Sequence, residues 1–332
     1  MRIKDVAARA GVSVATVSRV LNQNPRVKPH LRERVLQAMT EMDYRPSGIA
    51  RNMRNQSARV IGLIISDIQN PFFTALVRAV EDVAYANQYT VLLCNSDEDP
   101  QKEQLYVDVL STERVAGVII VPTSGDCCTP LLNRHIPIVM ADRKVPGLAT
   151  DSVTLDNVAG AYQATAHLIS LGHRRIGLVG APLHVSVGRE RRQGYEKALQ
   201  EHGIPVDETT IRTGNFKESG GYGAASELLG LDPRPTAIFA VNNLMTMGTL
   251  QAIHERGLRI PHDISVIGFD DMPWLPLLVP PLTAVRQPTY QIGAEAARLL
   301  FRRLREGPQK PIETIVLQPE LITRGSATAP AR

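Results

Sequence analysis

The chain has 332 residues, a mass of 36.4 kDa and a net charge of +4, and 43% of its residues are hydrophobic. This length and composition predict two or three domains of a soluble globular protein. No apolar run approaches the roughly 18–20 residues that span a bilayer, and the N-terminus lacks a signal-peptide core, which predicts a cytoplasmic protein without a membrane partner. The cysteines, Cys94, Cys127 and Cys128, fit neither a disulfide framework nor zinc spacing, so we expect reduced thiols.

The charge is unevenly distributed along the chain. Residues 1–59 contain twelve Lys or Arg and four Asp or Glu, whereas the remainder contains 25 basic and 29 acidic residues. A basic N-terminal segment on a mildly acidic body indicates that this segment meets a polyanion.

The N-terminal segment has the pattern of three short helices. In the first, apolar residues recur at i, i+3, i+4 and i+7: Ile3, Val6, Ala7 and Ala10. Gly11 can end this helix in the left-handed conformation, and Ser13 is a good N-cap for a second helix over 14–21. A third amphipathic pattern begins at Pro29. Three short helices with a glycine-centred turn are typical of a helix-turn-helix domain.

The second helix of such a domain lies in the DNA major groove, with its first residues against base edges. Arg19 can donate two hydrogen bonds to guanine, while Val14 and Ala15 offer only small apolar surfaces, for instance to a thymine methyl group. Lys4 is expected on a phosphate, where it adds affinity but little sequence reading. The predicted DNA contacts in this region are Lys4, Val14, Ala15, Thr16, Ser18, Arg19 and Asn22.

The next segment, "YRPSGIARNMRNQSAR" (44–59), should form at most a marginal helix by itself. Pro46 interrupts the helical run and Gly48 lowers helix propensity. Ile49, Ala50 and Met53 nevertheless form an apolar stripe. The stripe is compatible with a helix, and a plain flexible linker is the alternative.

The stretch "IKDVAARAGVSVATVSRVLN" resembles the DNA-binding head of the lac repressor (LacI/GalR) family of transcription regulators, and "VSVATVSRV" is similar to the galactose-repressor type of reading helix. The resemblance implies that residues 46–59 form a hinge helix, that this helix folds when two subunits bind operator DNA, and that an apolar side chain wedges into the minor groove. Met53 stands where leucine is commoner, and it can still act as a wedge. The DNA contacts implied in the hinge are Ala50, Met53 and Arg54.

From residue 60 the pattern changes to short apolar runs between helical stretches, at 59–65, 89–95, 116–122, 136–142, 175–180, 237–242 and 264–270. Such runs predict buried parallel strands of a doubly wound α/β fold, and their number predicts two lobes. We expect a helix-turn-helix domain over 1–45, a hinge over 46–59 and an effector-binding and dimerisation domain over 60–332. The first lobe should span about 60–158 plus 290–322, and the second about 159–289.

Ligands in such folds bind at the carboxyl ends of the strands, where aromatic, carboxylate, amide and arginine side chains recur in this chain. The body resembles the family's effector domain and the periplasmic sugar-binding proteins, so the resemblance covers essentially the whole chain. Carried over by position, it implies an effector site of Phe72, Phe73, Asp142, Val187, Arg191, Phe216, Asn242 and Asp270. Val185 and Val187 make the specificity loop unusually apolar, and Asn243 stands where many relatives have aspartate.

Each of these residues also has a structural alternative. Asp142 and Asp270 follow strands, where an aspartate often caps a helix, and Arg191 could form a surface ion pair. Phe72 and Phe73 could belong to the core of a lobe. At the level of function, the alternatives are an enzyme and an architectural DNA-binding protein without a ligand. The sequence has no phosphate-binding loop, dinucleotide fingerprint, nucleophile elbow or metal-site spacing, so we expect no catalytic residue, cofactor or metal.

These patterns together predict a homodimeric, allosteric repressor. A twofold dimer requires a near-palindromic operator in double-stranded DNA. A sugar or sugar derivative bound between the lobes would control operator binding. We expect it to act as an inducer, because the resemblance implies that the ligand more often releases DNA than promotes binding. The tail "RGSATAPAR" has no leucine heptads, which favours a dimer over a tetramer.

Overall fold

The structure of the protein is a computed structural model that describes residues 3–21, 24, 26–42, 44, 59–123, 128–307 and 311–331. The chain divides into two compact units, Met1–Ala58 and Arg59–Arg332. Within the described residues, no helix combines the length and the apolar character needed to cross a membrane.

The first unit contains the three predicted helices, α1 (Ile3–Ala10), α2 (Val14–Leu21) and α3 (Pro29–Glu41). Gly11 connects α1 and α2 with a φ of 61°, a left-handed conformation that glycine adopts without a steric cost. Ser13 caps α2, since its Oγ accepts a hydrogen bond of 3.1 Å from the Thr16 N–H. The core of this unit consists of Val6, Ala7, Ala10, Val17, Val20, Val35 and Ala38.

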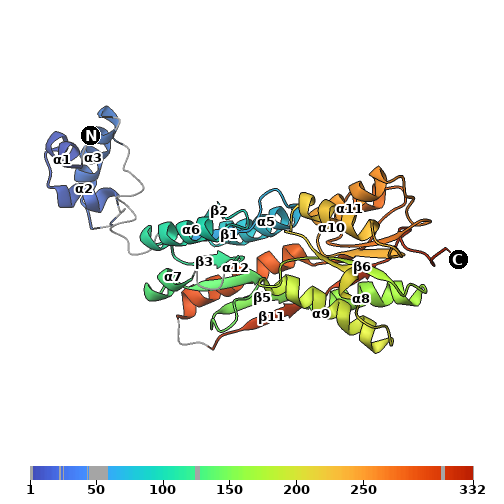
Figure 1. Ribbon diagram of the computed structural model, residues 1–332. Helices are drawn as coiled ribbons and strands as arrows, with labels where there is room; N and C mark the ends of the chain where they lie inside the picture. The colour runs from blue at the N-terminus through green and yellow to red at the C-terminus, as the bar shows by residue number, and fades with distance from the viewer. Residues whose placement is uncertain are drawn as a thin grey trace. The chain divides into compact units, whose positions relative to one another are not determined.

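The second unit is built on two six-stranded sheets, one in each of two lobes (Figure 1). The first sheet has the order β11-β5-β4-β3-β1-β2. Its strands are β1 (Val60–Ile65), β2 (Thr90–Asn95), β3 (Val118–Ile120), β4 (Ile138–Asp142), β5 (Asp151–Leu155) and β11 (Thr314–Leu317). The second sheet has the order β12-β10-β9-β8-β6-β7. Its strands are β6 (Ile176–Gly180), β7 (Ile211–Thr213), β8 (Ala237–Ala240), β9 (Ser265–Phe269), β10 (Thr283–Arg286) and β12 (Glu320–Ile322).

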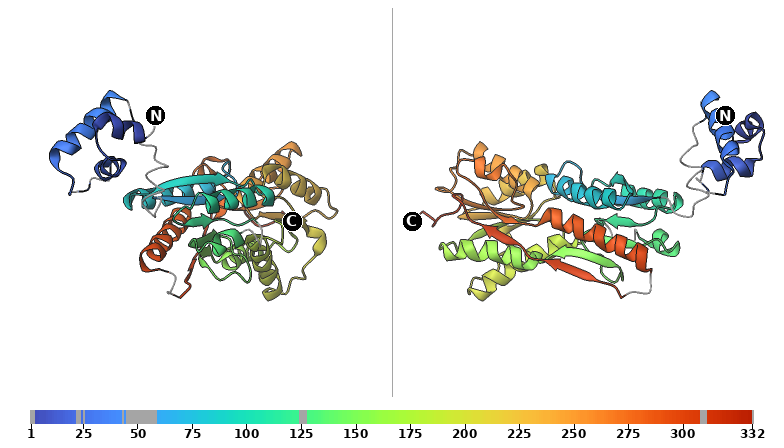
Figure 2. Two further views of the ribbon diagram at one scale, coloured as in Figure 1. Left: turned by 90° about the vertical axis from the view of Figure 1, so that its left-hand side faces the viewer. Right: turned by 180° about the vertical axis from the view of Figure 1, so that it is seen from behind.

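Helices surround both sheets (Figure 2). The helices of the first lobe are α5 (Pro71–Ala86), α6 (Pro100–Thr112), α7 (Thr129–Asn133) and α12 (Thr289–Glu306). Those of the second lobe are α8 (Asn157–Ser170), α9 (Ser186–Glu201), α10 (Glu218–Leu229) and α11 (Asn243–Glu255), with short 3-10 turns at Glu208–Thr210 and Leu275–Leu277. Asn70, Asp99, Asp156 and Asn242 cap α5, α6, α8 and α11 through their side chains.

Strand β1 shows why the sheets read as continuous apolar runs. Leu63 packs with α5 and α12 on one face, whereas Ile64 packs with Val107 and Leu110 of α6 on the other. Because both faces are covered, the five successive residues after Val60 are all buried.

All seven predicted runs contain a strand, which confirms the two-sheet α/β architecture. Five further strands escaped the prediction, namely β5, β7, β10, β11 and β12. In β5, Asp151 is a buried acid that Arg303 neutralises from α12, with contacts of 2.9 and 2.6 Å. A polar residue of this kind breaks an apolar run without exposing the strand.

The predicted lobe boundaries need two corrections. The prediction places residues 320–322 in the first lobe, but β12 pairs with β10 in the second sheet, and it does so antiparallel whereas the other paired strands run parallel. Helix α8 begins at Asn157 and packs against α9 and β10, so the second lobe starts slightly before residue 159. The chain therefore crosses between the lobes three times, before α8, before α12 and before β12.

Candidate functional site

The first unit presents part of the predicted DNA-reading surface. Arg19, Ala15 and Lys4 are exposed, while Val14, Thr16 and Ser18 are half-buried. The opposite face of α2 is buried through Val17 and Val20, as expected for a helix that packs on one side only. The predicted contacts Asn22, Ala50, Met53 and Arg54, and residues 46–58 of the hinge predicted over 46–59, lie outside the described residues. The DNA-contacting roles stay predictions.

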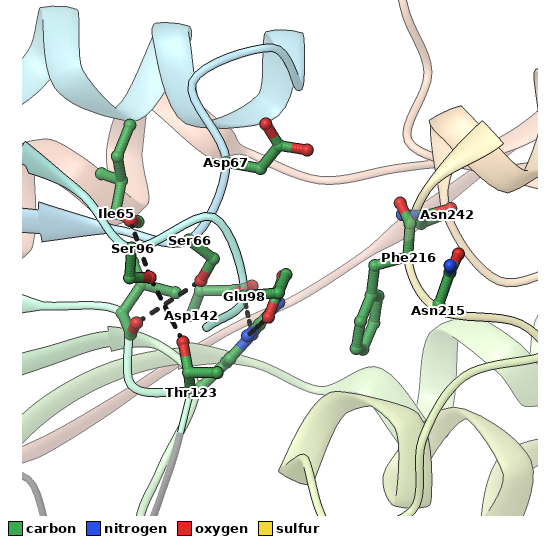
Figure 3. Close-up of polar contacts among 12 residues, drawn as sticks. Ile65, Ser66, Asp67, Ser96, Glu98, Thr123, Asp142, Asn215, Phe216 and Asn242 are labelled. Carbon is green, nitrogen blue, oxygen red and sulfur yellow. Dashed lines mark hydrogen bonds and ion pairs between the residues drawn. The ribbon is translucent and has the colours of Figure 1, made fainter. Parts of the chain in front are cut away.

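In the second unit, polar and aromatic side chains from the ends of both sheets face one another. Figure 3 shows Ser66, Glu98 and Asp142 of the first lobe on one side, and Phe216 and Asn242 of the second lobe on the other. These residues follow strands β1, β2, β4, β7 and β8, at the carboxyl edges where α/β folds bind ligands.

Arg191 lies at the centre of this region on helix α9, with only 3% of its side chain exposed. Its Nε donates to Asn157 Oδ1 at 2.9 Å, and its Nη1 donates to the Val241 carbonyl at 2.6 Å. The guanidinium lies 3.8 Å from the ring centroid of Phe269. Burial lowers the pKa of Arg191, while Asp270 and Asp142 act in the opposite direction. The alternative of a surface ion pair is therefore wrong for this residue.

Asp270 is a buried carboxylate that the protein itself partly satisfies. It has a left-handed φ of 75° directly after β9. Its Oδ2 accepts from the backbone N–H of Asn243 at 3.1 Å, and its Oδ1 accepts from Gln287 at 2.5 Å. Burial raises its pKa, while Arg191 lowers it. Asp270 thus accepts a hydrogen bond from the first turn of α11, although it follows a neighbouring strand. This role is similar to the helix cap that was its predicted structural alternative.

Asn242 is the N-cap of helix α11. Its Oδ1 accepts from the Met245 N–H at 2.8 Å, and its Nδ2 donates to the Phe216 carbonyl at 3.0 Å. Both ends of the amide are thus bonded within the chain. This arrangement gives Asn242 a structural role in positioning Phe216, beside the effector contact predicted for it.

Asp142 is the least satisfied acid of the region. It ends β4 with a φ of 65° and is 5% exposed, and it caps none of the described helices. Among the described residues, its Oδ1 has no hydrogen-bond partner. Its Oδ2 lies 3.6 Å from Arg143 Nε. Burial raises the pKa of Asp142 to about 6, against the opposing effect of Arg143 and Arg191.

The predicted apolar contacts are all buried. Phe72 and Phe73 are each 3% exposed, meet edge to face at 5.0 Å and belong to the core of the first lobe, which favours their structural alternative. Val187 is 2% exposed in the first turn of α9. Phe216 is 7% exposed and has a φ of 65°, and the Arg143 guanidinium lies 4.8 Å from its ring centroid.

Contacts between the lobes bring in Lys217, Asp67, Asp97 and Asn70, which the sequence patterns did not single out, together with Asn243, which they did. Lys217 of the second lobe donates to Asp67 at 2.9 Å and to Asp97 at 2.5 Å, both on the first lobe. Asn243 Nδ2 donates to Asn70 Oδ1 at 2.8 Å, again across the lobes. Partial burial works to lower the pKa of Lys217, but the two carboxylates hold it above its usual range. In the sequence, the only sign that Asp67, Asp97 and Lys217 belong to the site was that they lie shortly after β1, β2 and β7.

A cavity of about 210 Å³ opens beside this region, between the two lobes. Thr123, Arg143 and Lys144 line it from the first lobe, and His184 and Ser186 line it from the second. The Lys144 N–H donates to Ser186 Oγ at 3.2 Å, so the wall of the cavity is itself a contact between lobes. Within the part of the chain that the structure describes, no group of three or more His, Cys, Asp or Glu could hold a metal ion.

We expect Lys217→Met to open the lobes. Asp67 is 3% exposed and would lose the cation that neutralises it in the closed arrangement, a loss of about 1–3 kcal/mol. The radius of gyration from small-angle X-ray scattering should therefore increase. Lys197→Met is a matched control, because Lys197 is an exposed lysine of the second lobe that contacts only residues of that lobe among those described, Glu201 at 3.9 Å and the Tyr162 ring at 5.5 Å. An equal change in both variants would contradict a latch at Lys217.

Comparison with known proteins gives matches along the whole chain. Residues 2–47 match the model of bacterial regulatory proteins of the lacI family, and residues 165–327 match a periplasmic binding protein-like domain. The HTH-type transcriptional repressor PurR of Mannheimia succiniciproducens is 36% identical over 98% of both chains.

Solved structures give the same result. A LacI family transcriptional regulator from Enterococcus faecium with bound ribose is 34% identical, with a TM-score of 0.73, over 82% of this chain and 100% of that one. The lac repressor dimer bound to operator and the anti-inducer ONPF is 28% identical, with a TM-score of 0.81, over 99% of both chains.

Proposed function

The chain belongs to the lacI family of bacterial regulatory proteins, which are DNA-binding transcriptional regulators and not enzymes, and we propose that it is a repressor controlled by a small sugar-like effector. The observation that carries this proposal is the burial of Asp142, Arg191 and Asp270, at 5%, 3% and 4% exposure, together with an Asp142 oxygen that has no hydrogen-bond partner among the described residues. Buried charges without full pairing are costly to a fold, and a hydroxyl-bearing ligand would complete their hydrogen bonds.

We propose a monosaccharide as the ligand of this site. The Enterococcus faecium regulator with bound ribose supports a sugar of this size, and we propose that the regulated genes serve carbohydrate or related catabolism. Sugar hydroxyls can donate to Asp142 and accept from Arg191.

Control would follow from the contacts between the lobes. A ligand that prefers the closed arrangement shifts the population toward it, and the shift can be no larger than the difference in affinity between the two arrangements. Closure would change the spacing of the hinges over 46–59 in two subunits and so alter operator binding, most simply as release by an inducer.

An apolar edge of the first lobe supports a homodimer. Strand β2 ends the sheet, and its Leu92 and Leu93 are 41% and 36% exposed. Leu105 of α6 and Tyr85 of α5 are 59% and 79% exposed on the helices that pack beside it. An unpaired strand edge with apolar neighbours favours a protein partner, and a second copy would satisfy the twofold symmetry of an operator.

The proposal is tested with full-length protein and a panel of sugars, sugar acids, sugar phosphates and nucleobases. A ligand that binds only the folded state raises the thermal unfolding midpoint, and the same ligand should change affinity for the operator found by selection from random DNA. No shift with any member would favour an architectural DNA-binding protein. A lack of preference for any duplex would overturn the regulator itself.

Arg19→Ala is expected to weaken operator binding by about 1–3 kcal/mol and to relax base preference at one position of each half-site. The reason is that Arg19 is exposed on α2, where it can reach the edge of a guanine. Binding to a library of operator variants measures both effects. Lys4→Ala is the control, because loss of a phosphate contact weakens all sequences alike and lowers the salt dependence. The same uniform loss for Arg19→Ala would count against base reading.

A further inference from the structure

We propose that the cleft accepts uncharged polyhydroxyl ligands and rejects anionic ones, because Glu98 holds the guanidinium of Arg143 in a buried ion pair. This inference rests on the proposed effector site and specifies its ligand class. Glu98 would then be a specificity-determining residue that contacts no ligand itself.

The ion pair uses the face of Arg143 that would otherwise bind an anion. Arg143 Nη1 donates to Glu98 Oε2 at 2.7 Å, and Nη2 donates to Oε1 at 2.6 Å. The two side chains are 3% and 14% exposed, so water screens the pair only weakly. A bidentate arginine–carboxylate fork is also the geometry with which arginine binds phosphates and carboxylates of ligands. Glu98 therefore stands where an anionic ligand group would bind.

Glu98 is held in place by its backbone. Its φ is 60°, that of the preceding Asp97 is 58°, and its N–H donates to the Ser66 carbonyl at 2.9 Å. Two successive non-glycine residues in the left-handed region form a defined turn after β2. On the far side of Arg143, the ring of Phe216 from the second lobe covers the guanidinium. The pair is thus contacted by both lobes, and Figure 3 shows Glu98 on the side of the first lobe, facing Phe216 of the second.

Two other cations of the cleft are also engaged. Lys217 bonds to Asp67 and Asp97, and Arg191 bonds to Asn157 and the Val241 carbonyl. These contacts occupy the charge of Lys217 and two of the nitrogen atoms of Arg191.

The unsatisfied groups of the cleft are mostly acceptors. Among the described residues, Asp142 Oδ1 and Gln287 Oε1 are buried without hydrogen-bond partners, while Arg143 Nε is the matching unpartnered donor. Acceptors of this kind require hydroxyl or N–H donors from a ligand. A phosphate or carboxylate has no such donor when ionised, and it would face Asp142 and Asp270 as a like charge.

The test compares matched ligands on the full-length protein by calorimetry: D-ribose with D-ribose 5-phosphate, and D-galactose with D-galacturonate. We expect the wild type to bind the neutral member of any pair that it recognises at least about tenfold more tightly than the anionic member. E98Q keeps the shape of the side chain and removes its charge, so the ratio should move toward the anionic member by about tenfold or more. Inorganic phosphate should raise the unfolding midpoint of E98Q and leave the wild type unchanged.

D151N is the control, because Asp151 forms a similar buried bidentate pair with Arg303 in the first lobe, outside the cleft. It should lower stability without changing either ligand ratio. Wild-type protein that binds an anionic member as tightly as its neutral partner overturns the inference, even if E98Q does not fold. Folded E98Q that responds to phosphate as the wild type does overturns it as well. Failure of the proposed function would give a separate result: no neutral or anionic sugar would bind the wild type or change its unfolding midpoint.

Discussion

Replacing Arg191 by methionine is expected to destabilise the second unit by about 3–5 kcal/mol and to abolish the response to effector. The variant removes the cation beside two buried carboxylates, Asp142 and Asp270, and leaves Asn157 Oδ1 and the Val241 carbonyl without their donor. Methionine fills much of the volume over the Phe269 ring, so the loss reports on charge and hydrogen bonding more than on a cavity. The thermal midpoint should fall on the order of 10 °C.

Arg192→Met is the matched control for this variant. Arg192 follows directly on α9 but is 24% exposed and pairs with Glu196 and Glu208 at the surface, where an ion pair contributes about 0–1 kcal/mol. The loss in the Arg191 variant should also grow as the pH rises, because the carboxylates then ionise without a compensating cation. A stable Arg191→Met that still binds a sugar with full affinity would contradict the electrostatic role assigned here.

Asp142→Asn is expected to do the opposite, with higher stability and weaker ligand binding. The folded carboxyl has a pKa of about 6 against an ordinary value of 3.8, so between about pH 4 and 6 the folded state holds a proton that the unfolded chain has lost. Wild-type stability therefore falls as the pH rises through this window, by about 3 kcal/mol in total. Asparagine cannot ionise and tolerates the φ of 65°, so the variant avoids this loss.

Unfolding midpoints measured from pH 4 to 8 test this prediction. The variant should exceed the wild type by several degrees at pH 7.5, and the two should converge toward pH 4. Sugar affinity should fall about 10- to 100-fold, since a charged acceptor becomes a neutral one. Asp156→Asn is the control, because asparagine caps a helix as well as aspartate does and the Asp156 carboxylate only caps α8. If the stability of the wild type rises from pH 4 to 6 by the same amount as that of the Asp142→Asn variant, Asp142 is not the group responsible.

The sequence predicted strands that are apolar on both faces and missed those that carry polar groups. Leu63 and Ile64 show the first case, since α5 and α6 bury opposite faces of β1. Strand β5 shows the second, because Asp151 depends on Arg303 of α12, which lies 152 residues later in the chain. No local pattern contains that partner.

The residues of the site were limited in the same way, because a local pattern does not contain a distant partner. Asp142, Arg191 and Asp270 could be selected because the family resemblance assigns effector contacts to their positions. Glu98 and Lys217 could not, because an acid in a turn and a lysine before a helix are ordinary surface residues until the fold places Arg143 and Asp67 against them. Asn242 was selected, yet both ends of its amide bond within the chain.

The three chain crossings give the two lobes unequal connections to the rest of the protein. Residue 59 leads directly into β1 of the first lobe, whereas the tail is fixed in the second, where Ser326 Oγ donates to the Val266 carbonyl at 2.6 Å and the Thr328 N–H donates to Ser265 Oγ at 3.1 Å. The second lobe therefore has no covalent route to the N-terminal unit except through the first. A fluorescent protein fused after residue 331 would move with the second lobe alone, so energy transfer to a dye on α6 would report lobe rotation while leaving the operator-reading helices unlabelled.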